Sequence, residues 1–196
     1  MVDDPMAFAA VLGLGTGLGC LALALAAVGD RTAHLTHAVM GIAMAGMVSP
    51  WGDPVPVWTG AVGFTVLGAW FAATVLRGDR SNGTARHLAI SSAAMVLMYL
   101  MHGHHTGPPG AAGSGLHAGY GGTDASSLVV LPLALALVVY FVWHTWTCVD
   151  RAVDKARAAT TAPGTVAVRN RLATRIEPVA HGVMSALMAA MFLGAV

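Results

Sequence analysis

Six long apolar stretches alternate with short polar connections along the whole chain. Each stretch is close to the roughly 20 residues that a helix needs to cross a bilayer. They cover residues of about 6–28, 33–49, 56–76, 85–102, 127–148 and 178–196. The second is the shortest, and a helix there could lie partly at the membrane interface. The pattern predicts an all-α fold: an integral membrane bundle of six transmembrane helices in a single membrane domain, residues 1–196.

Basic residues lie on only one side of this pattern. All ten Lys and Arg residues fall in three connections, at Arg31, at 77–86 and at 151–175. The segments that alternate with them carry Asp residues but no Lys or Arg. Because cytoplasmic loops are enriched in Lys and Arg, the three basic connections are expected in the cytoplasm. The N- and C-termini are then both extracytoplasmic, and the protein is expected in the cell membrane.

Two of the connections have a distinctive composition. Residues 103–126 are rich in Gly, His and Pro and cannot build a core, so they are expected to form an outer loop. Residues 149–176 are basic and are expected to form a cytoplasmic connection, with 150–159 continuing the fifth helix. The sixth helix is expected to begin at 177–178, Glu-Pro, because an acid and a proline both suit a first helical turn.

The composition agrees with residence in a membrane. The chain is 56% hydrophobic and 10% charged, and its mean hydropathy is +0.69, whereas soluble domains carry about a quarter charged residues. A net charge of +1 and the lack of a basic arm argue against nucleic acid as a partner. The expected partners are the lipid bilayer, a metal ion as argued below, and a membrane protein or a second copy of this chain.

The first apolar stretch carries evenly spaced glycines. Gly13, Gly15, Gly17 and Gly19 form two overlapping pairs of small residues four positions apart. Such pairs allow two helix backbones to approach closely in lipid. The spacing of a phosphate-binding loop is absent, so the glycines predict helix packing.

Histidine and methionine recur at matching intervals on two stretches. The second stretch carries His37, Met40, Met44 and Met47, and the sixth carries His181, Met184, Met188 and Met191. Offsets of 0, 3, 7 and 10 residues fall on one helix face about 80° wide. The fourth stretch carries a looser version, with His87, Met95, Met98, Met101 and His102.

The predicted topology gives these side chains an order across the membrane. His34, His37, His87, His144 and His181 lie toward the cytoplasm, methionines follow, and His102, His104, His105 and His117 lie at the outer surface. Thioether sulfur suits Cu(I), and imidazole binds Cu(I), Cu(II) and Zn(II). The order predicts a soft-metal site or path, with copper suspected. The candidate metal ligands are His37, Met40, Met44, Met47, His87, Met98, His102, His104, His105, His144, His181, Met184, Met188 and Met191.

Other interpretations of the same pattern stay open. Methionine also fills irregular gaps in a core, and these stripes are interleaved with the small residues of a close-packed membrane interface. The chain would then be a structural or accessory subunit without a cofactor. A redox protein holding haem b through His37, His144 or His181 is a further alternative. An enzyme is not expected, since no nucleophile elbow, no His-Glu-x-x-His and no acidic pair occurs in the apolar stretches.

The two histidine–methionine segments also carry a resemblance. His-Ala-Val-Met-Gly-Ile-Ala-Met-Ala-Gly-Met at 37–47 and His-Gly-Val-Met-Ser-Ala-Leu-Met-Ala-Ala-Met at 181–191, with the His-rich loop between them, resemble an actinobacterial multi-pass membrane family, domain of unknown function 5134. The resemblance implies a source and a membrane location for nearly the whole chain, and no reaction or ligand. The Met-x-x-x-Met element is also similar to that of the small eukaryotic copper importers, which have three helices per chain.

Overall fold

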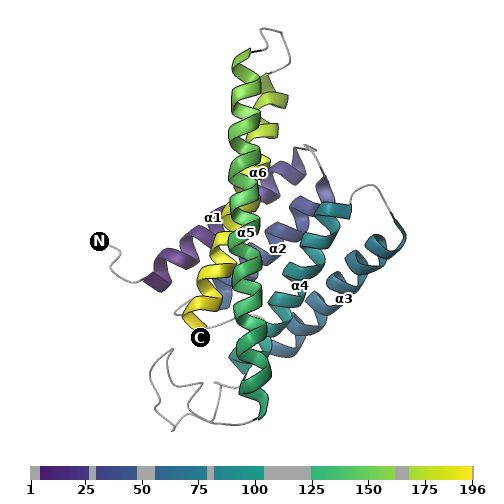
Figure 1. The fold of residues 1–196 in the computed structure, drawn as a ribbon, viewed down its shortest axis with the longest axis vertical. Coiled ribbons are helices and arrows are strands. Elements are labelled where there is room, and N and C mark those ends of the chain that lie inside the picture. Colours follow the sequence, from purple (N-terminus) through teal and green to yellow (C-terminus); the bar gives the residue numbers. More distant parts are fainter. Residues whose placement is uncertain are drawn as a thin grey trace. The chain divides into compact units, whose positions relative to one another are not determined.

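Six helices make up the part of the chain that the structure describes. The structure is a computed structural model, and it describes residues 5–26, 30–47, 56–78, 82–103, 125–161 and 168–195 (Figure 1). The helices are α1 (Pro5–Leu25), α2 (Arg31–Met47), α3 (Val57–Leu76), α4 (Asn82–Gly103), α5 (Ala125–Thr161) and α6 (Val168–Ala195). The predicted all-α fold is therefore confirmed for these residues.

The last two helices are longer than the apolar stretches that predicted them. α5 continues to Thr161, which includes the extension expected over 150–159. α6 begins at Val168, so Pro178 lies inside the helix and the expected start at 177–178 is wrong. The residues before Pro178 include three arginines, a leucine and an alanine, which all favour helix. These residues carry the helix ten positions toward the N-terminus from Pro178, although the proline itself lacks a backbone N–H group.

Three helical segments in the described part of the chain are long and apolar enough to cross a membrane. They are Val57–Leu76, Gly83–Met101 and Val130–Arg157. Ala10–Leu25 and Pro178–Leu193 are apolar but shorter. α2 has 17 residues, which span about 25 Å at 1.5 Å per residue, less than the roughly 30 Å of a hydrocarbon core. The fold thus supports three of the six predicted spans, and the other three stay predictions.

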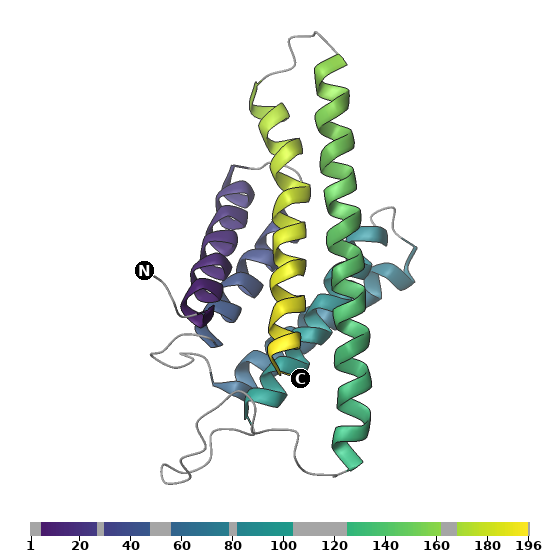
Figure 2. The ribbon, with the colours of Figure 1, turned by 60° about the vertical axis from the view of Figure 1, so that its left-hand side comes forward.

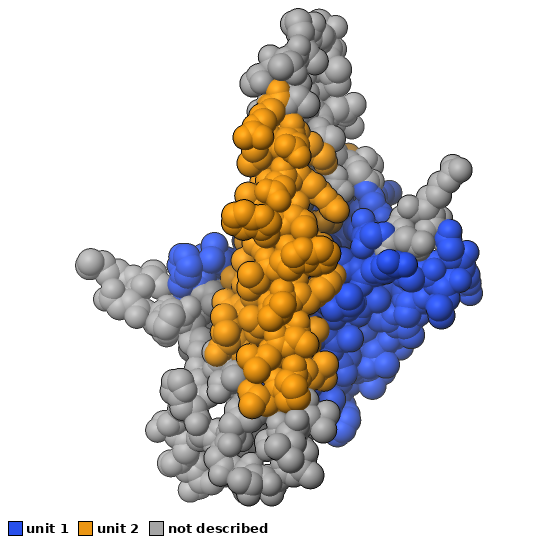
Figure 3. Space-filling model, in the orientation of Figure 1, with its two compact units in different colours: residues 1–24, 30–111 blue, residues 25–29, 112–196 orange. Residues whose placement is uncertain are grey.

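Contacts divide the chain into two compact units (Figure 3). Unit 1 comprises Met1–Ala24 and Asp30–Ala111, and unit 2 comprises Leu25–Gly29 and Ala112–Val196. Unit 1 therefore holds α2, α3, α4 and nearly all of α1, while unit 2 holds α5 and α6. The single membrane domain expected for residues 1–196 stays a prediction, and each unit is described by itself.

The first two helices of unit 1 touch through their backbones. A Cβ atom added to Gly41 of α2 would lie 2.7 Å from the Gly13 carbonyl oxygen and 2.8 Å from the Gly17 Cα atom. Gly13 and Gly17 are the glycines of α1 that face α2, whereas a Cβ on Gly15 or Gly19 would have nothing within 4 Å. The predicted glycine packing is therefore made by one of the two overlapping pairs.

α3 and α4 pack side by side and antiparallel in unit 1 (Figures 1 and 2). Near the start of α4, Leu88 packs in a buried cluster with Phe71 of α3 and Ala33 of α2. Near its end, the Tyr99 ring lies against Phe64, with ring centroids 6.0 Å apart. A Cβ on Gly60 would overlap the Tyr99 ring, so the glycine makes this approach possible.

Unit 2 is an antiparallel pair of long helices, α5 and α6 (Figures 1 and 2). Phe141 and Phe192 are both buried, and their rings are parallel within 12° with centroids 6.5 Å apart. The opposite face of α5 exposes Val139, Trp143 and Trp146. Large apolar side chains on an exposed face agree with a lipid environment.

We predict that Gly41→Ala destabilises the protein. Its methyl group would meet the α1 backbone, which cannot move aside as a flexible side chain can, so the two helices must separate at a cost of roughly 1–3 kcal/mol. Thermal unfolding in detergent, followed by circular dichroism, should show a lower melting temperature. Gly15→Ala is the matched control, because a Cβ there meets open space. Equal melting temperatures for the two variants would contradict the packing described for α1 and α2.

Candidate functional site

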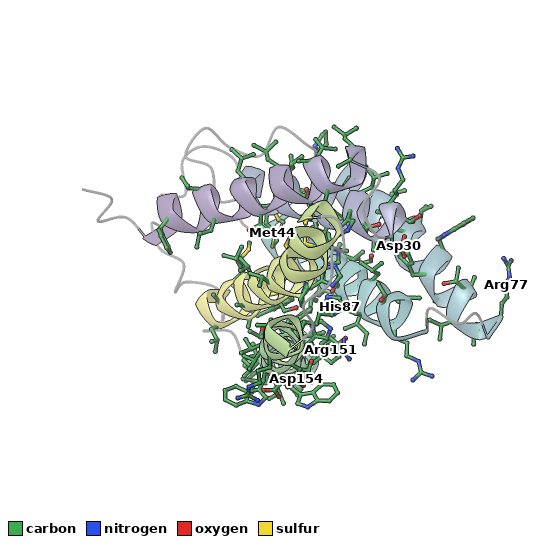
Figure 4. All side chains as sticks on the ribbon, turned by 90° about the horizontal axis from the view of Figure 1, so that it is seen from above. Asp30, Met44, Arg77, His87, Arg151 and Asp154 are labelled. Carbon is green, nitrogen blue, oxygen red and sulfur yellow. The ribbon has the colours of Figure 1, made fainter. Side chains whose placement is uncertain are left out.

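The turn before α2 fixes where the histidines of that helix lie. The Asp30 carboxylate accepts hydrogen bonds from the backbone N–H groups of Thr32, at 2.9 Å, and Ala33, at 3.3 Å, which satisfies donors that a helix N-terminus leaves unpaired. Figure 4 labels Asp30 at this position. Arg31 Nε donates to the Ala24 carbonyl oxygen at 3.1 Å, near the end of α1. These contacts set the start of α2, and hence the helix face on which its histidines lie.

His37 of α2 and His87 of α4 come together in unit 1. Their imidazole rings are nearly parallel, with 20° between the ring planes and 5.8 Å between the centroids. The two residues are only 0% and 2% exposed. Both were predicted as candidate ligands from sequence, but nothing in the sequence paired them with each other. Polar side chains buried inside an apolar bundle tend to face one another and to carry function.

Hydrogen bonds orient both rings. His37 Nδ1 lies 2.8 Å from the Ala33 carbonyl oxygen. Because a carbonyl only accepts, Nδ1 carries the hydrogen, and in the neutral ring Nε2 carries the lone pair. His87 Nε2 lies 3.5 Å from Ser91 Oγ, one turn further along α4. A histidine that binds a metal typically donates its other ring N–H to a carbonyl in this way.

Buried thioethers follow the histidine pair on both helices. α2 and α4 run in the same direction (Figures 1 and 2). The methionines come about 4 to 11 Å after His37 along α2, and about 12 to 17 Å after His87 along α4, at 1.5 Å per residue. We call the following residues the α2–α4 site: His37, Met40, Met44, His87, Met95 and Met98. All six are buried, and Figure 4 labels Met44 and His87.

The α2–α4 site contains neutral ligands only. Within the described ranges, no three His, Cys, Asp or Glu side chains gather in a way that could hold a metal ion. A structural zinc site needs four such ligands. A metal at the α2–α4 site would therefore need thioether sulfur in addition to its two imidazoles, and that donor set favours a soft ion.

Unit 2 contains a smaller polar cluster around His144. His144 Nδ1 lies 3.1 Å from Ser185 Oγ of α6 and 3.6 Å from Cys148 Sγ of its own helix. The Tyr140 ring lies on the other side, with centroids 6.0 Å apart. The sequence predicted His144 but missed its partners. The four-residue spacing of His144 and Cys148 on one helix face could have indicated their contact.

The remaining candidate ligands divide between the two units. In unit 1, Met47 is partly buried at the end of α2. In unit 2, Met184 and Met188 of α6 are buried, while His181 and Met191 are partly buried. The stripes of α2 and α6 therefore belong to different units, and their convergence on one path stays a prediction.

The outer histidines lie beyond the described side chains. His102 is within α4, but its side chain is not described, and His104 and His105 lie outside the described residues. Two buried serines of α4 were missed from the sequence. Ser91 contacts His87, and Ser92 faces α3, where a Cβ on Gly68 would lie 3.3 Å from Ser92 Cβ. Ser91 lies four residues from His87 and Ser92 lies five, and such small side chains give only a weak signal in a sequence rich in Ala and Gly.

Comparison with known proteins gives a family but no activity. No curated protein and no solved structure matches the chain. One family model does match, over residues 29–195, which include the α2–α4 site and all of α2 to α6. The match covers well over half of the chain. The protein therefore belongs to the family described as Domain of unknown function (DUF5134).

Proposed function

We propose that the protein binds Cu(I) inside the membrane, at the α2–α4 site. One observation carries the proposal: two buried imidazole rings from different helices face each other, and buried thioethers follow them along both helices. Imidazole and thioether are the neutral protein ligands that suit Cu(I). Neutral ligands leave a bound Cu(I) with a single positive charge, which costs less to bury than a divalent ion.

The closeness of the two rings supports the binding of one ion at their edges. Their centroids are 5.8 Å apart and their planes are within 20° of parallel. Because the lone pair of an imidazole nitrogen lies in the ring plane, the ion would bind beside the stacked pair and not between the two ring faces. The hydrogen bond from His37 Nδ1 to Ala33 leaves Nε2 as the ligand atom of that ring. For His87 we assign Nδ1, because Nε2 contacts Ser91.

The methionines then serve as further ligands, either to the same ion or to an ion that moves along the helices. Met40 lies nearest to the pair along α2, one turn from His37, and is the thioether we assign to the site itself. Met44, Met95 and Met98 lie further along the two helices and offer successive soft ligands. The second buried stripe, Met184 and Met188 of α6, extends the proposal from a storage site to a path if the two units place the stripes together.

The proposal includes the six-span topology. The three connections with Arg and Lys face the cytoplasm, and both termini lie outside. Arg77 at the end of α3 and Arg151 on α5 are both exposed, as residues in contact with water or lipid headgroups would be (Figure 4). The histidine pair then lies near the cytoplasmic side, and the thioethers lead outward.

Two other functions compete with copper binding. A haem b protein would use His37, His144 or His181 as axial ligands. His37 contacts His87, and His144 contacts Ser185, each within its own unit, and such contacts could orient a ligand of copper or of haem. An accessory subunit without a cofactor would use the same methionines for packing only.

We predict that the purified full-length chain binds one Cu(I) with an affinity that depends on His87. His87→Ala should weaken binding at least about tenfold, a change that second-shell substitutions at metal sites already produce. Met40→Leu should weaken it as well, because leucine keeps the volume but has no sulfur. Competition with a chromophoric Cu(I) chelator measures both affinities.

Met188→Leu is the matched control for the copper titration. It removes a thioether that is equally buried but lies in unit 2, so binding at the α2–α4 site should not change. The cofactor-free alternative predicts no Cu(I) binding above the background of unspecific sites. Copper binding that survives both His87→Ala and Met40→Leu would place the ion elsewhere and would contradict the proposed site.

We predict that the two ends of α3 react with a membrane-impermeant thiol reagent from opposite sides. Pro56→Cys should be labelled in intact cells, and Arg77→Cys only in inside-out vesicles. Arg157→Cys should behave as Arg77→Cys does, since both belong to basic connections. The native thiols of Cys20 and Cys148 are buried and should give little background. Labelling of Pro56→Cys and Arg77→Cys from the same side would exclude α3 as a span.

We predict that the purified protein has no Soret absorption band, even when the cells are supplied with haem precursor. The same preparation should contain copper by elemental analysis after growth with added copper. A stoichiometric Soret band that His37→Ala abolishes would favour the haem alternative over copper.

A further inference from the structure

We propose that unit 1 binds one acyl chain of a membrane phospholipid in a cavity between α2 and α3. The cavity has a volume of about 320 Å³, within the range of about 300 Å³ and above that is typical of ligand pockets. Val39, Ile42 and Gly46 line it from α2, Gly63 and Phe64 from α3, and Tyr99 from α4. All of these residues belong to unit 1, and none belongs to the α2–α4 site.

The apolar walls of the cavity favour a hydrocarbon occupant over water. A buried water needs two to four polar partners, and apolar cavities stay dry and take up apolar molecules. The lining is aliphatic and aromatic apart from the hydroxyl groups of Thr59 and Tyr99. The backbone N–H groups on both sides lie within α2 or α3 and are already paired, including those of Thr59 and Gly60 at the start of α3. A hydrocarbon chain meets these walls without losing any hydrogen bond.

The surroundings of the cavity indicate where that chain comes from. Val39 and Ile42 are half exposed, and on α3 Trp58 and Val62 are more exposed still. α3 is long and apolar enough to cross a membrane. An exposed apolar face of this kind is solvated by lipid, so the hydrocarbon available at the mouth of the cavity is that of the bilayer.

Glycine makes the space for the chain. Gly63 lies on the α3 wall, and a Cβ added to it would have nothing within 4 Å. One helical turn earlier, Gly60 allows the Tyr99 ring to reach the cavity, where the ring is held against Phe64. A larger residue at position 63 would therefore fill the cavity without displacing a neighbour.

Because the cavity lies along α2, a bound acyl chain would contact one side of this helix. α2 carries His37 and Met40 on the face described for the α2–α4 site, and Val39 and Ile42 on the cavity side. A bound acyl chain would thus support α2 from the side opposite to its polar contacts. The proposal does not depend on copper, because no cavity-lining residue is a copper ligand.

Photolabelling of the full-length chain tests the proposal. The protein is reconstituted in phosphatidylcholine vesicles that contain a phosphatidylcholine with a diazirine at the middle of one acyl chain. After irradiation, mass spectrometry of peptides should find labels concentrated on residues 39–46 of α2 and 59–67 of α3. In Gly63→Leu this labelling should fall to less than about a fifth, because the leucine side chain occupies the volume.

Gly19→Leu is the matched control, since position 19 is also helical and open but lies on α1 away from the cavity. It should leave the labelling of α2 and α3 unchanged. Ile42→Trp, which narrows the cavity from the opposite wall, serves as a second variant. The labelling of Gly63→Leu and Ile42→Trp is compared with that of the native chain once each variant shows the same melting temperature as the native chain. Undiminished labelling in folded Gly63→Leu, or labels spread evenly over the exposed face of α3, would overturn the proposal.

Discussion

The contact between His37 and His87 is the constraint on which the interpretation of unit 1 depends. Two imidazole rings are buried where the surrounding helices and lipid cannot hydrate them. Burying a polar group is costly unless it finds a partner, and in a bilayer that partner must come from the protein. The Ala33 carbonyl and the Ser91 hydroxyl supply partners on the outer sides of the pair. The two rings stack against each other between these contacts, and the copper proposal assigns their other ring nitrogens as ligands.

α2 connects every feature of unit 1 because its faces have different neighbours. Gly41 allows α1 to approach at backbone distance, His37 faces α4, and Val39 and Ile42 line the cavity against α3. At 17 residues the helix is at the short end of the range that can cross a bilayer, and its position is set by contacts with these three neighbours. A change at Gly41 therefore acts on the histidine pair through the position of the whole helix.

Much of the fold follows from local patterns, and much of the site does not. Apolar length predicted the helices, and the spacing of Gly13 and Gly17 predicted a close helix contact. The start of α6 was misplaced because the favourable helix residues before Pro178 outweigh the proline, a balance that end signals alone do not measure. The stripes predicted which faces of α2 and α4 are buried. The pairing of His37 with His87, and of His144 with Ser185, depends on which helices pack together. No periodicity within one helix contains that information. The same packing places the stripes of α2 and α6 in two different units.

X-ray absorption spectroscopy of the Cu(I)-loaded protein tests the central claim most directly, since it reports the atoms bound to the metal. We expect both kinds of ligand around the ion, with nitrogen at roughly 2.0 Å and sulfur at roughly 2.3 Å. In His87→Ala the nitrogen contribution should fall while sulfur remains. A shell of oxygen and nitrogen without sulfur, or a spectrum that His87→Ala leaves unchanged, would contradict a copper site formed by α2 and α4.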